Sequence, residues 1–131
     1  LPYGDFVIVT VPETPETQGM FAIRQFESMK KSSFFINVGR GATVIIDDLA
    51  DALHSGEIAG AGLDVFQKEP LPAGHKLWNA PGVLITPHVA AIGPDGFGYL
   101  RKRAASVFIE NCIRFNEGNQ LKNIVDKANW F

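Results

Sequence analysis

Four short runs of apolar residues lie in the first two thirds of the chain and predict the strands of a sheet. They cover residues 6–11 (Phe-Val-Ile-Val-Thr-Val), 34–38, 61–66 and 83–86. The run at residues 6–11 does not alternate apolar with polar positions, which is typical of a strand that a parallel sheet buries on both faces. Proline or glycine directly follows three of the runs, at Pro12, Gly39 and Pro87.

Three segments with helical periodicity lie between and after these runs. The first covers residues 22–31, the second begins with Asp47 as its N-cap and stops at Gly56, and the third covers residues 99–117 before Gly118. Apolar residues on one face of the third segment are Leu100, Ala104, Phe108, Cys112 and Phe115. Because strands and helices alternate along the chain, the sequence predicts an α/β fold with a parallel sheet and right-handed crossovers.

Composition and charge exclude several classes of function. The 131 residues are 46% hydrophobic and 20% charged, with a formal net charge of -2. This balance supplies no basic field for a nucleic acid or an anionic membrane surface, so neither partner is expected. Cys112 is the only cysteine, which excludes an internal disulfide and a multi-cysteine metal site and favours a cytoplasmic location. No apolar run reaches the roughly 18 residues of a membrane span.

Reactive side chains follow the ends of the predicted strands. In an open parallel sheet the ligand crevice lies beyond the carboxyl ends of the strands, which makes these positions candidates for a site. Arg40, between two glycines, could bind a carboxylate with its planar guanidinium and polarise an adjacent carbonyl. His88 could give or take a proton near neutral pH. Glu69 or Asp64 could hydrogen bond the other ring nitrogen, fix its tautomer and favour the imidazolium.

Each candidate also has a structural interpretation. Arg40 alone fits a surface ion pair, Glu69 a solvated loop, and His88 a packed histidine. Two further histidines, His54 and His75, are expected on the surface. The remaining candidates also have structural roles: Cys112 is expected in the core, and the pair Asp47-Asp48 fits helix capping better than metal binding, so no metal site is predicted.

Three stretches of the sequence resemble one enzyme family in their order and spacing. They are residues 35–41 (Phe-Ile-Asn-Val-Gly-Arg-Gly), 61–70 (Ala-Gly-Leu-Asp-Val-Phe-Gln-Lys-Glu-Pro) and 86–88 (Thr-Pro-His). Together they resemble the D-isomer-specific 2-hydroxyacid dehydrogenases, such as glyoxylate/hydroxypyruvate reductase and phosphoglycerate dehydrogenase. The resemblance extends from Val7 to about Gly118.

The resemblance implies an oxidoreductase that transfers hydride between NAD(P)H and a small 2-keto or 2-hydroxy acid. It implies that Arg40 binds the substrate carboxylate, that His88 is the acid and base, and that Glu69 orients and charges His88. Contacts to NAD or NADP are implied at Val11, Pro12, Val38, Gly39, Arg40, Asp64, His88 and Ala91. The carboxylate of Asp64 would accept a hydrogen bond from the nicotinamide carboxamide.

The same resemblance implies a three-layer Rossmann-type parallel sheet of which only the C-terminal half is expected here. No Gly-x-Gly-x-x-Gly turn for the cofactor pyrophosphate occurs in the sequence. Residues 1–118 are therefore expected to be the C-terminal part of a dinucleotide-binding domain. Residues 119–131 would be a tail that returns to a substrate domain, with Trp130 and Phe131 as docking residues. The full-length protein is expected to be a homodimer.

Two other readings stay open at this level. The family scaffold also resembles the C-terminal-binding-protein corepressors, in which a dinucleotide regulates a binding module. Alternatively, the 131 residues are an inactive fragment that is only a folding unit. In the usual order of the family's sheet, the strand at residues 6–11 would pair with a first strand that is absent here, and the resulting unpaired apolar edge predicts self-association or a longer parent protein.

Overall fold

The computed structural model describes residues 1–128 and divides the chain into two compact units. The first unit is Leu1–Ala90 and the second is Ala91–Phe131, so the site candidates other than Ala91 all belong to the first. The predicted docking residues Trp130 and Phe131 lie outside the described residues. No helix within residues 1–128 is long and apolar enough to cross a membrane.

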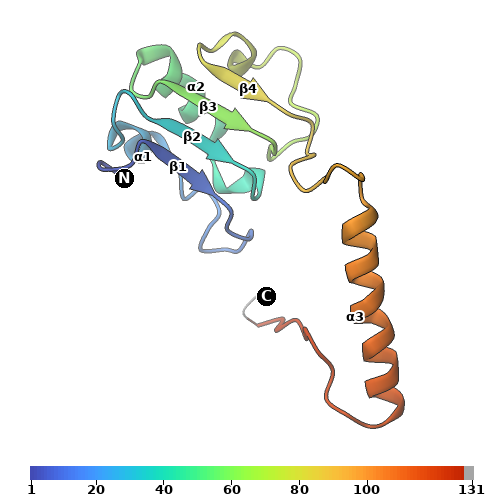
Figure 1. The fold of residues 1–131 in the computed structure, drawn as a ribbon. Coiled ribbons are helices and arrows are strands. Elements are labelled where there is room, and N and C mark those ends of the chain that lie inside the picture. Colours follow the sequence, from blue (N-terminus) through green and yellow to red (C-terminus); the bar gives the residue numbers. More distant parts are fainter. Residues whose placement is uncertain (129–131) are drawn as a thin grey trace. The chain divides into compact units, whose positions relative to one another are not determined.

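The first unit contains the predicted parallel sheet (Figure 1). Its four strands lie in the order β1-β2-β3-β4, and every neighbouring pair is parallel. They are β1 (Phe6–Val9), β2 (Phe34–Asn37), β3 (Gly60–Leu63) and β4 (Val83–Ile85). All four strands are shorter than the predicted runs, because the backbone leaves the ladder after Val9, Asn37, Leu63 and Ile85. The α/β, Rossmann-type fold class is confirmed.

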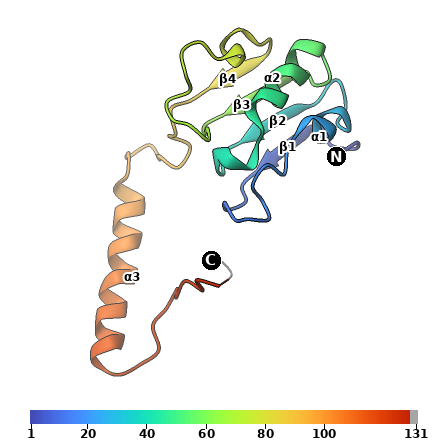
Figure 2. The same ribbon diagram turned by 180° about the vertical axis from the view of Figure 1, so that it is seen from behind.

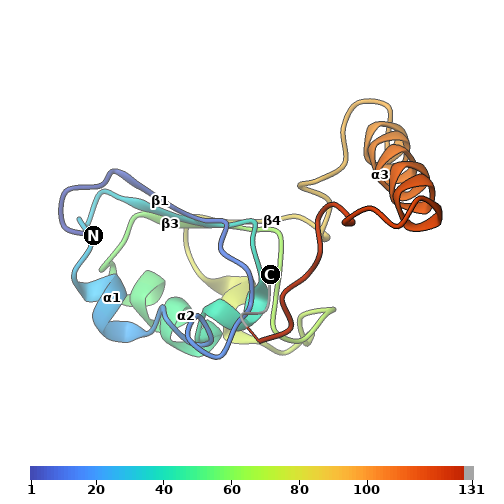
Figure 3. The same ribbon diagram turned by 90° about the horizontal axis from the view of Figure 1, so that it is seen from below.

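Both short helices of the first unit pack on the same face of this sheet. They are α1 (Ile23–Glu27) and α2 (Ile46–Ser55), and Figure 3 shows them together on one side of the strands, the side seen in Figure 2. The core between the layers includes five fully buried large side chains: Phe26, Phe35, Leu49, Leu53 and Leu77. Phe26 and Phe35 meet edge to face with ring centroids 5.2 Å apart, and deleting one such ring costs about 3–5 kcal/mol.

The opposite face of the sheet is open in the first unit. Phe6 is 63% exposed, Ile8 58% and Leu84 67%, whereas Val9 is buried. Residues 6–11 are thus buried on one face only in this unit, in contrast to the predicted burial on both. The first unit accordingly has two of the three expected layers.

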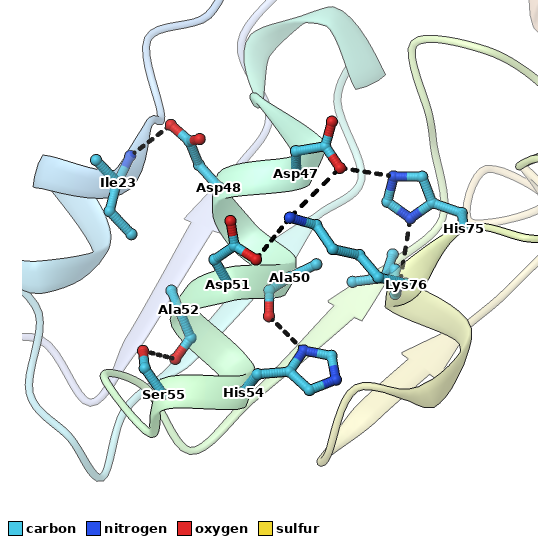
Figure 4. A network of polar contacts seen from close by, with 11 residues as sticks. Ile23, Asp47, Asp48, Ala50, Asp51, Ala52, His54, Ser55, His75 and Lys76 are labelled. Atoms are coloured by element: carbon cyan, nitrogen blue, oxygen red, sulfur yellow. Dashed lines mark hydrogen bonds and ion pairs between the residues drawn. The ribbon is translucent and has the colours of Figure 1, made fainter.

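The N-terminus of α2 differs from the prediction that Asp47 caps it. Ile45 is the N-cap, because the chain at Val44 still pairs in extended form with Phe21 and turns into the helix only afterwards. Asp48 lies in the first turn, where its Oδ2 accepts a hydrogen bond of 2.9 Å from the backbone N–H of Ile23 (Figure 4). The helix ends as predicted at Gly56, whose φ of 73° lies in the left-handed region.

The two histidines predicted on the surface differ in their burial. His54 is exposed, with Nδ1 2.7 Å from the carbonyl oxygen of Ala50. His75 has a side chain that is only 14% exposed, so its surface prediction is wrong. Its Nδ1 accepts a hydrogen bond from the Leu77 N–H at the start of the 3-10 helix η2 (Lys76–Asn79), and its Nε2 lies 3.4 Å from Asp47 Oδ1 (Figure 4).

The second unit contains one long helix, α3 (Gly98–Asn116), close to the predicted range. None of its residues is buried, because no further helix or strand packs against it among residues 91–128 of this unit. Cys112 is exposed, which corrects its predicted place in the core. The chain after α3 folds back on the helix through Asn111, whose side chain exchanges two hydrogen bonds with the backbone of Lys122.

Candidate active site

Arg40 follows β2 in a turn that the buried side chain of Asn37 organises. Asn37 Oδ1 accepts a hydrogen bond from Gly39 N–H at 3.0 Å, and Nδ2 donates to the carbonyl oxygen of Arg40 at 3.1 Å. The hydroxyl of Thr43 donates to the same carbonyl at 2.7 Å. Asn37 and Thr43 are 1% and 0% exposed. The sequence analysis did not predict that Asn37 and Thr43 hold this turn. For Asn37 a signal was present, because it is a polar residue near the end of an otherwise apolar run.

Glycine at position 41 lets this turn approach the loop that follows β3. A Cβ on Gly41 would lie 1.9 Å from the carbonyl carbon of Phe66 and 2.3 Å from the amide nitrogen of Gln67. No side chain fits there, because carbon atoms in ordinary contact stay at least 3.4 Å apart. The close approach places the backbone of Arg40 next to the segment that leads to Glu69.

Glu69 and His88 form a hydrogen-bonded pair. His88 Nδ1 lies 2.9 Å from Glu69 Oε2, and the other carboxylate oxygen, Oε1, accepts a bond of 2.9 Å from Phe66 N–H. Of the two carboxylates considered for His88, the structure therefore places Glu69 on its ring. Asp64 instead bonds to Thr86 and to the backbone that follows His88.

The electrostatics of the pair keep Glu69 ionised. The hydrogen bond from His88, followed by the bond from Phe66 N–H, lowers the pKa of the Glu69 carboxyl below its ordinary value of 4.5, although partial burial opposes this shift. With Nδ1 donating to an ionised Glu69, the Nε2 atom of His88 is the nitrogen left for a substrate. The φ angle of His88 is 56°, a left-handed conformation that costs a non-glycine residue about 1–2 kcal/mol.

Two cavities, each of about 290 Å³, meet at this pair. The first is mostly apolar and is lined by Asp64, Phe66, Glu69, Pro70, Leu71, Trp78, Ile85, Thr86, Pro87 and His88. The second is more polar and is lined by Glu13, Arg40, Gly41, Ala42, Val65, Phe66, Gln67, Glu69 and His88. The second cavity thus brings together the three residues that sequence reasoning assigned to chemistry, Arg40, Glu69 and His88.

The other sequence candidates lie at the neighbouring strand ends, apart from one. Val11 and Pro12 follow β1, and a Cβ on Gly39 would lie 3.0 Å from the carbonyl oxygen of Val11. Val38 begins the turn after β2 and is 39% exposed. Ala91 belongs to the second unit and is not placed relative to this group. Within residues 1–128, no group of three or more His, Cys, Asp or Glu residues could hold a metal ion.

Comparison with known proteins identifies the group to which the chain is related. The model of the D-isomer specific 2-hydroxyacid dehydrogenase NAD binding domain matches residues 1–90. A glyoxylate/hydroxypyruvate reductase A from Photorhabdus laumondii is 39% identical over 130 residues, covering 94% of this chain and 39% of that protein. A probable 2-ketogluconate reductase from Dictyostelium discoideum is 40% identical, covering 95% of this chain and 36% of that protein.

A solved structure gives the same result in three dimensions. The NADPH-dependent glyoxylate/hydroxypyruvate reductase of Sinorhizobium meliloti, in complex with NADP and sulfate, is 33% identical with a TM-score of 0.85. The match covers 100% of this chain and 41% of that one. The chain spans less than two fifths of the length of the two curated relatives described above. On the match of residues 1–90 to the family's NAD binding domain, the chain belongs to the D-isomer specific 2-hydroxyacid dehydrogenase family.

Proposed function

We propose that the chain is part of an oxidoreductase that transfers hydride between NAD(P)H and a small 2-keto or 2-hydroxy acid. The observation that carries this proposal is the shared cavity of Arg40, Glu69 and His88. It combines a cation for a carboxylate with a histidine whose ring is held by an ionised acid. The relatives named as glyoxylate/hydroxypyruvate and 2-ketogluconate reductases support the same substrate class.

The strand ends beside this cavity fit the nicotinamide half of the cofactor. Exposed Pro12 and Val38 offer apolar surface to a flat ring, and the close approach of Gly39 to Val11 leaves no side chain in the way. A bound dinucleotide supplies or accepts the hydride. The proposed contacts are Val11, Pro12, Val38, Gly39, Arg40, Asp64, His88 and Ala91, and NAD and NADP both stay open.

The chain's own residues would bind and protonate the substrate. The guanidinium of Arg40 holds the carboxylate and draws electron density from the adjacent carbonyl. His88 Nε2 donates its proton to the carbonyl oxygen in reduction and takes a proton from the hydroxyl in oxidation. The Glu69 carboxylate accepts a hydrogen bond from Nδ1–H, so that the ring keeps the tautomer and the orientation that the proton transfer requires.

Two substitutions test this assignment in the longest natural protein that contains the sequence. We expect His88→Asn to lower kcat by about 100- to 10,000-fold, the usual contribution of a general acid or base. Arg40→Ala should in addition raise KM for the keto acid roughly 10-fold or more, because it removes a charged hydrogen-bond partner. Arg40→Lys is the matched control that keeps the charge but loses the planar fork. Unchanged kinetics in both His88→Asn and Arg40→Ala would refute the proposal.

Localisation and assembly belong to the same proposal. We infer a cytoplasmic enzyme that is a homodimer in its full-length form. A corepressor-like binding module is not favoured, because the curated relatives described above are reductases by name. Size-exclusion chromatography with light scattering tests the dimer, and a monomer at micromolar concentration would contradict it.

A further inference from the structure

Asp64 is the best-connected acidic side chain near His88, although it does not touch the histidine ring. It is 4% exposed and lies directly after β3. Three consecutive backbone N–H groups point at this residue. His88 N–H donates to the carbonyl oxygen of Asp64 at 2.9 Å, Val89 N–H to Oδ1 at 2.9 Å, and Ala90 N–H to Oδ2 at 2.8 Å.

A fourth donor completes this arrangement from the other side of His88. The hydroxyl of Thr86 donates to Asp64 Oδ1 at 2.5 Å. Burial alone would raise the pKa of the Asp64 carboxyl, but the bonds from Thr86, Ala90 and Val89 lower it below its ordinary value. The carboxylate is therefore ionised and its oxygens are engaged on both sides of the histidine, at positions 86, 89 and 90.

His88 needs such support, because its backbone has an unfavourable conformation. Its φ of 56° lies in the left-handed region, which L-residues with a large side chain rarely adopt unless surrounding contacts hold them there. The bonds to Asp64 fix the backbone immediately after His88 and the hydroxyl two residues before it. The Cα–Cβ direction of His88 follows from this backbone, so the same bonds aim its ring at Glu69.

The geometry points to Asp64 as a positioning residue for His88, with Thr86 as its accessory. Asp64 acts through the backbone of residues 88–90 and not through contact with the reacting atoms. Oδ1 accepts from Thr86 and Val89 and Oδ2 from Ala90, so Oδ2 can still accept the bond from the nicotinamide carboxamide proposed above. The test of this inference by kcat rests on the proposed function, whereas its test by the NMR signal of His88 does not.

The decisive variant is Asp64→Asn, which keeps the shape but replaces an acceptor oxygen with a donor. One of the N–H groups at positions 89 and 90, or the Thr86 hydroxyl, then faces an NH2 group. We expect kcat to fall by about 100-fold, the effect of a displacement near 1 Å in a catalytic group, while KM for the keto acid stays within about twofold. The matched control is Asp48→Asn, which disturbs a carboxylate-to-backbone bond of the same length at Ile23. Its kcat should not change.

A spectroscopic readout separates positioning from general stability. In the protein labelled with 15N-histidine, the wild type should show His88 as the tautomer with its proton on Nδ1, held by Glu69. Asp64→Asn should broaden this signal or mix the tautomers, whereas Asp48→Asn should leave it unchanged. If Asp64→Asn does not fold, Thr86→Val replaces it as the test variant and should change the His88 15N signal in the same direction but by less. Thr86→Ser keeps the hydroxyl and should give the wild-type signal.

Two outcomes overturn the inference. An unchanged His88 signal with kcat within twofold would mean that the carboxylate is dispensable. A large loss of kcat with an unchanged His88 signal would mean that Asp64 acts only through its cofactor contact and does not position His88. If the wild-type protein reduces no keto acid, the proposed function fails, but the histidine spectra still decide whether Asp64 positions His88.

Discussion

Replacing Gly41 with alanine should separate the two loops that carry Arg40 and Glu69. The added Cβ would lie 1.9 Å from the carbonyl carbon of Phe66, so one backbone segment must retreat by at least 1.5 Å to reach the 3.4 Å of ordinary contact. The neighbour is backbone and not the end of a flexible side chain, so no change of rotamer relieves the clash. Forced shifts of this kind cost about 1–3 kcal/mol of folding free energy, and sometimes more.

The same displacement should also affect chemistry. Phe66 N–H holds Glu69 Oε1, so a shift of the Phe66 backbone moves the partner of His88 relative to Arg40. A misplacement of about 1 Å costs on the order of 100-fold in turnover. We therefore expect Gly41→Ala to lower both the free energy of unfolding and kcat.

Denaturant unfolding and steady-state reduction of a keto acid measure the two effects. Gly74→Ala is the matched control, since nothing lies within 4 Å of a Cβ at Gly74. That substitution should leave stability within about 1 kcal/mol of wild type, or raise it slightly by restricting the unfolded chain. Stability and turnover in Gly41→Ala equal to those of Gly74→Ala would refute the close approach of the two loops.

Two further predictions concern Glu69 and the cofactor. Because the folded pKa of Glu69 is depressed, its bonds contribute stability above its ordinary pKa of 4.5, and this contribution is lost as the pH falls through the lower folded value. The stability difference between wild type and Glu69→Gln, measured by urea unfolding, should accordingly shrink on acidification, and a constant difference would contradict the assignment. The 131 residues on their own should bind NADH only weakly, because their sequence has no Gly-x-Gly-x-x-Gly turn. A fluorescence titration giving a micromolar Kd would disprove this.

The strands were predictable because their apolar runs are local signals. The meeting of their carboxyl ends follows from the parallel α/β pattern, and this placed Arg40, Glu69 and His88 at one edge, whereas the order of the strands is seen only in the structure. The start of α2 was not predictable from the Asp47 pattern. A bridge between Phe21 and Val44 keeps the chain extended up to that point, and such a long-range pairing leaves no mark in the local sequence.

The partners of each acidic residue were also beyond the sequence, for a related reason. Asp64 and Glu69 both follow β3, and either spacing allows a bond to His88. The choice depends on where the backbone of residues 86–90 passes, and that backbone wraps around Asp64 and leaves Glu69 for the ring. Asn37, at the end of β2, is a comparable case, since only the fold shows that its amide holds the Arg40 turn.

The segment that follows β3 contacts every other part of the candidate site. The Arg40 turn rests on it through the contact of Gly41 with Phe66, and the backbone after His88 is bound to it through Asp64. Glu69 belongs to the same segment and is held by Phe66 N–H. The three proposed functional side chains therefore depend on a stretch of six residues, 64–69, and not on direct contact between the Arg40 and His88 loops. Hydrogen bonds to the backbone and the close approach of Gly41 fix the backbone positions of Arg40, Glu69 and His88. These backbone positions do not depend on the exposed side chains being rigid.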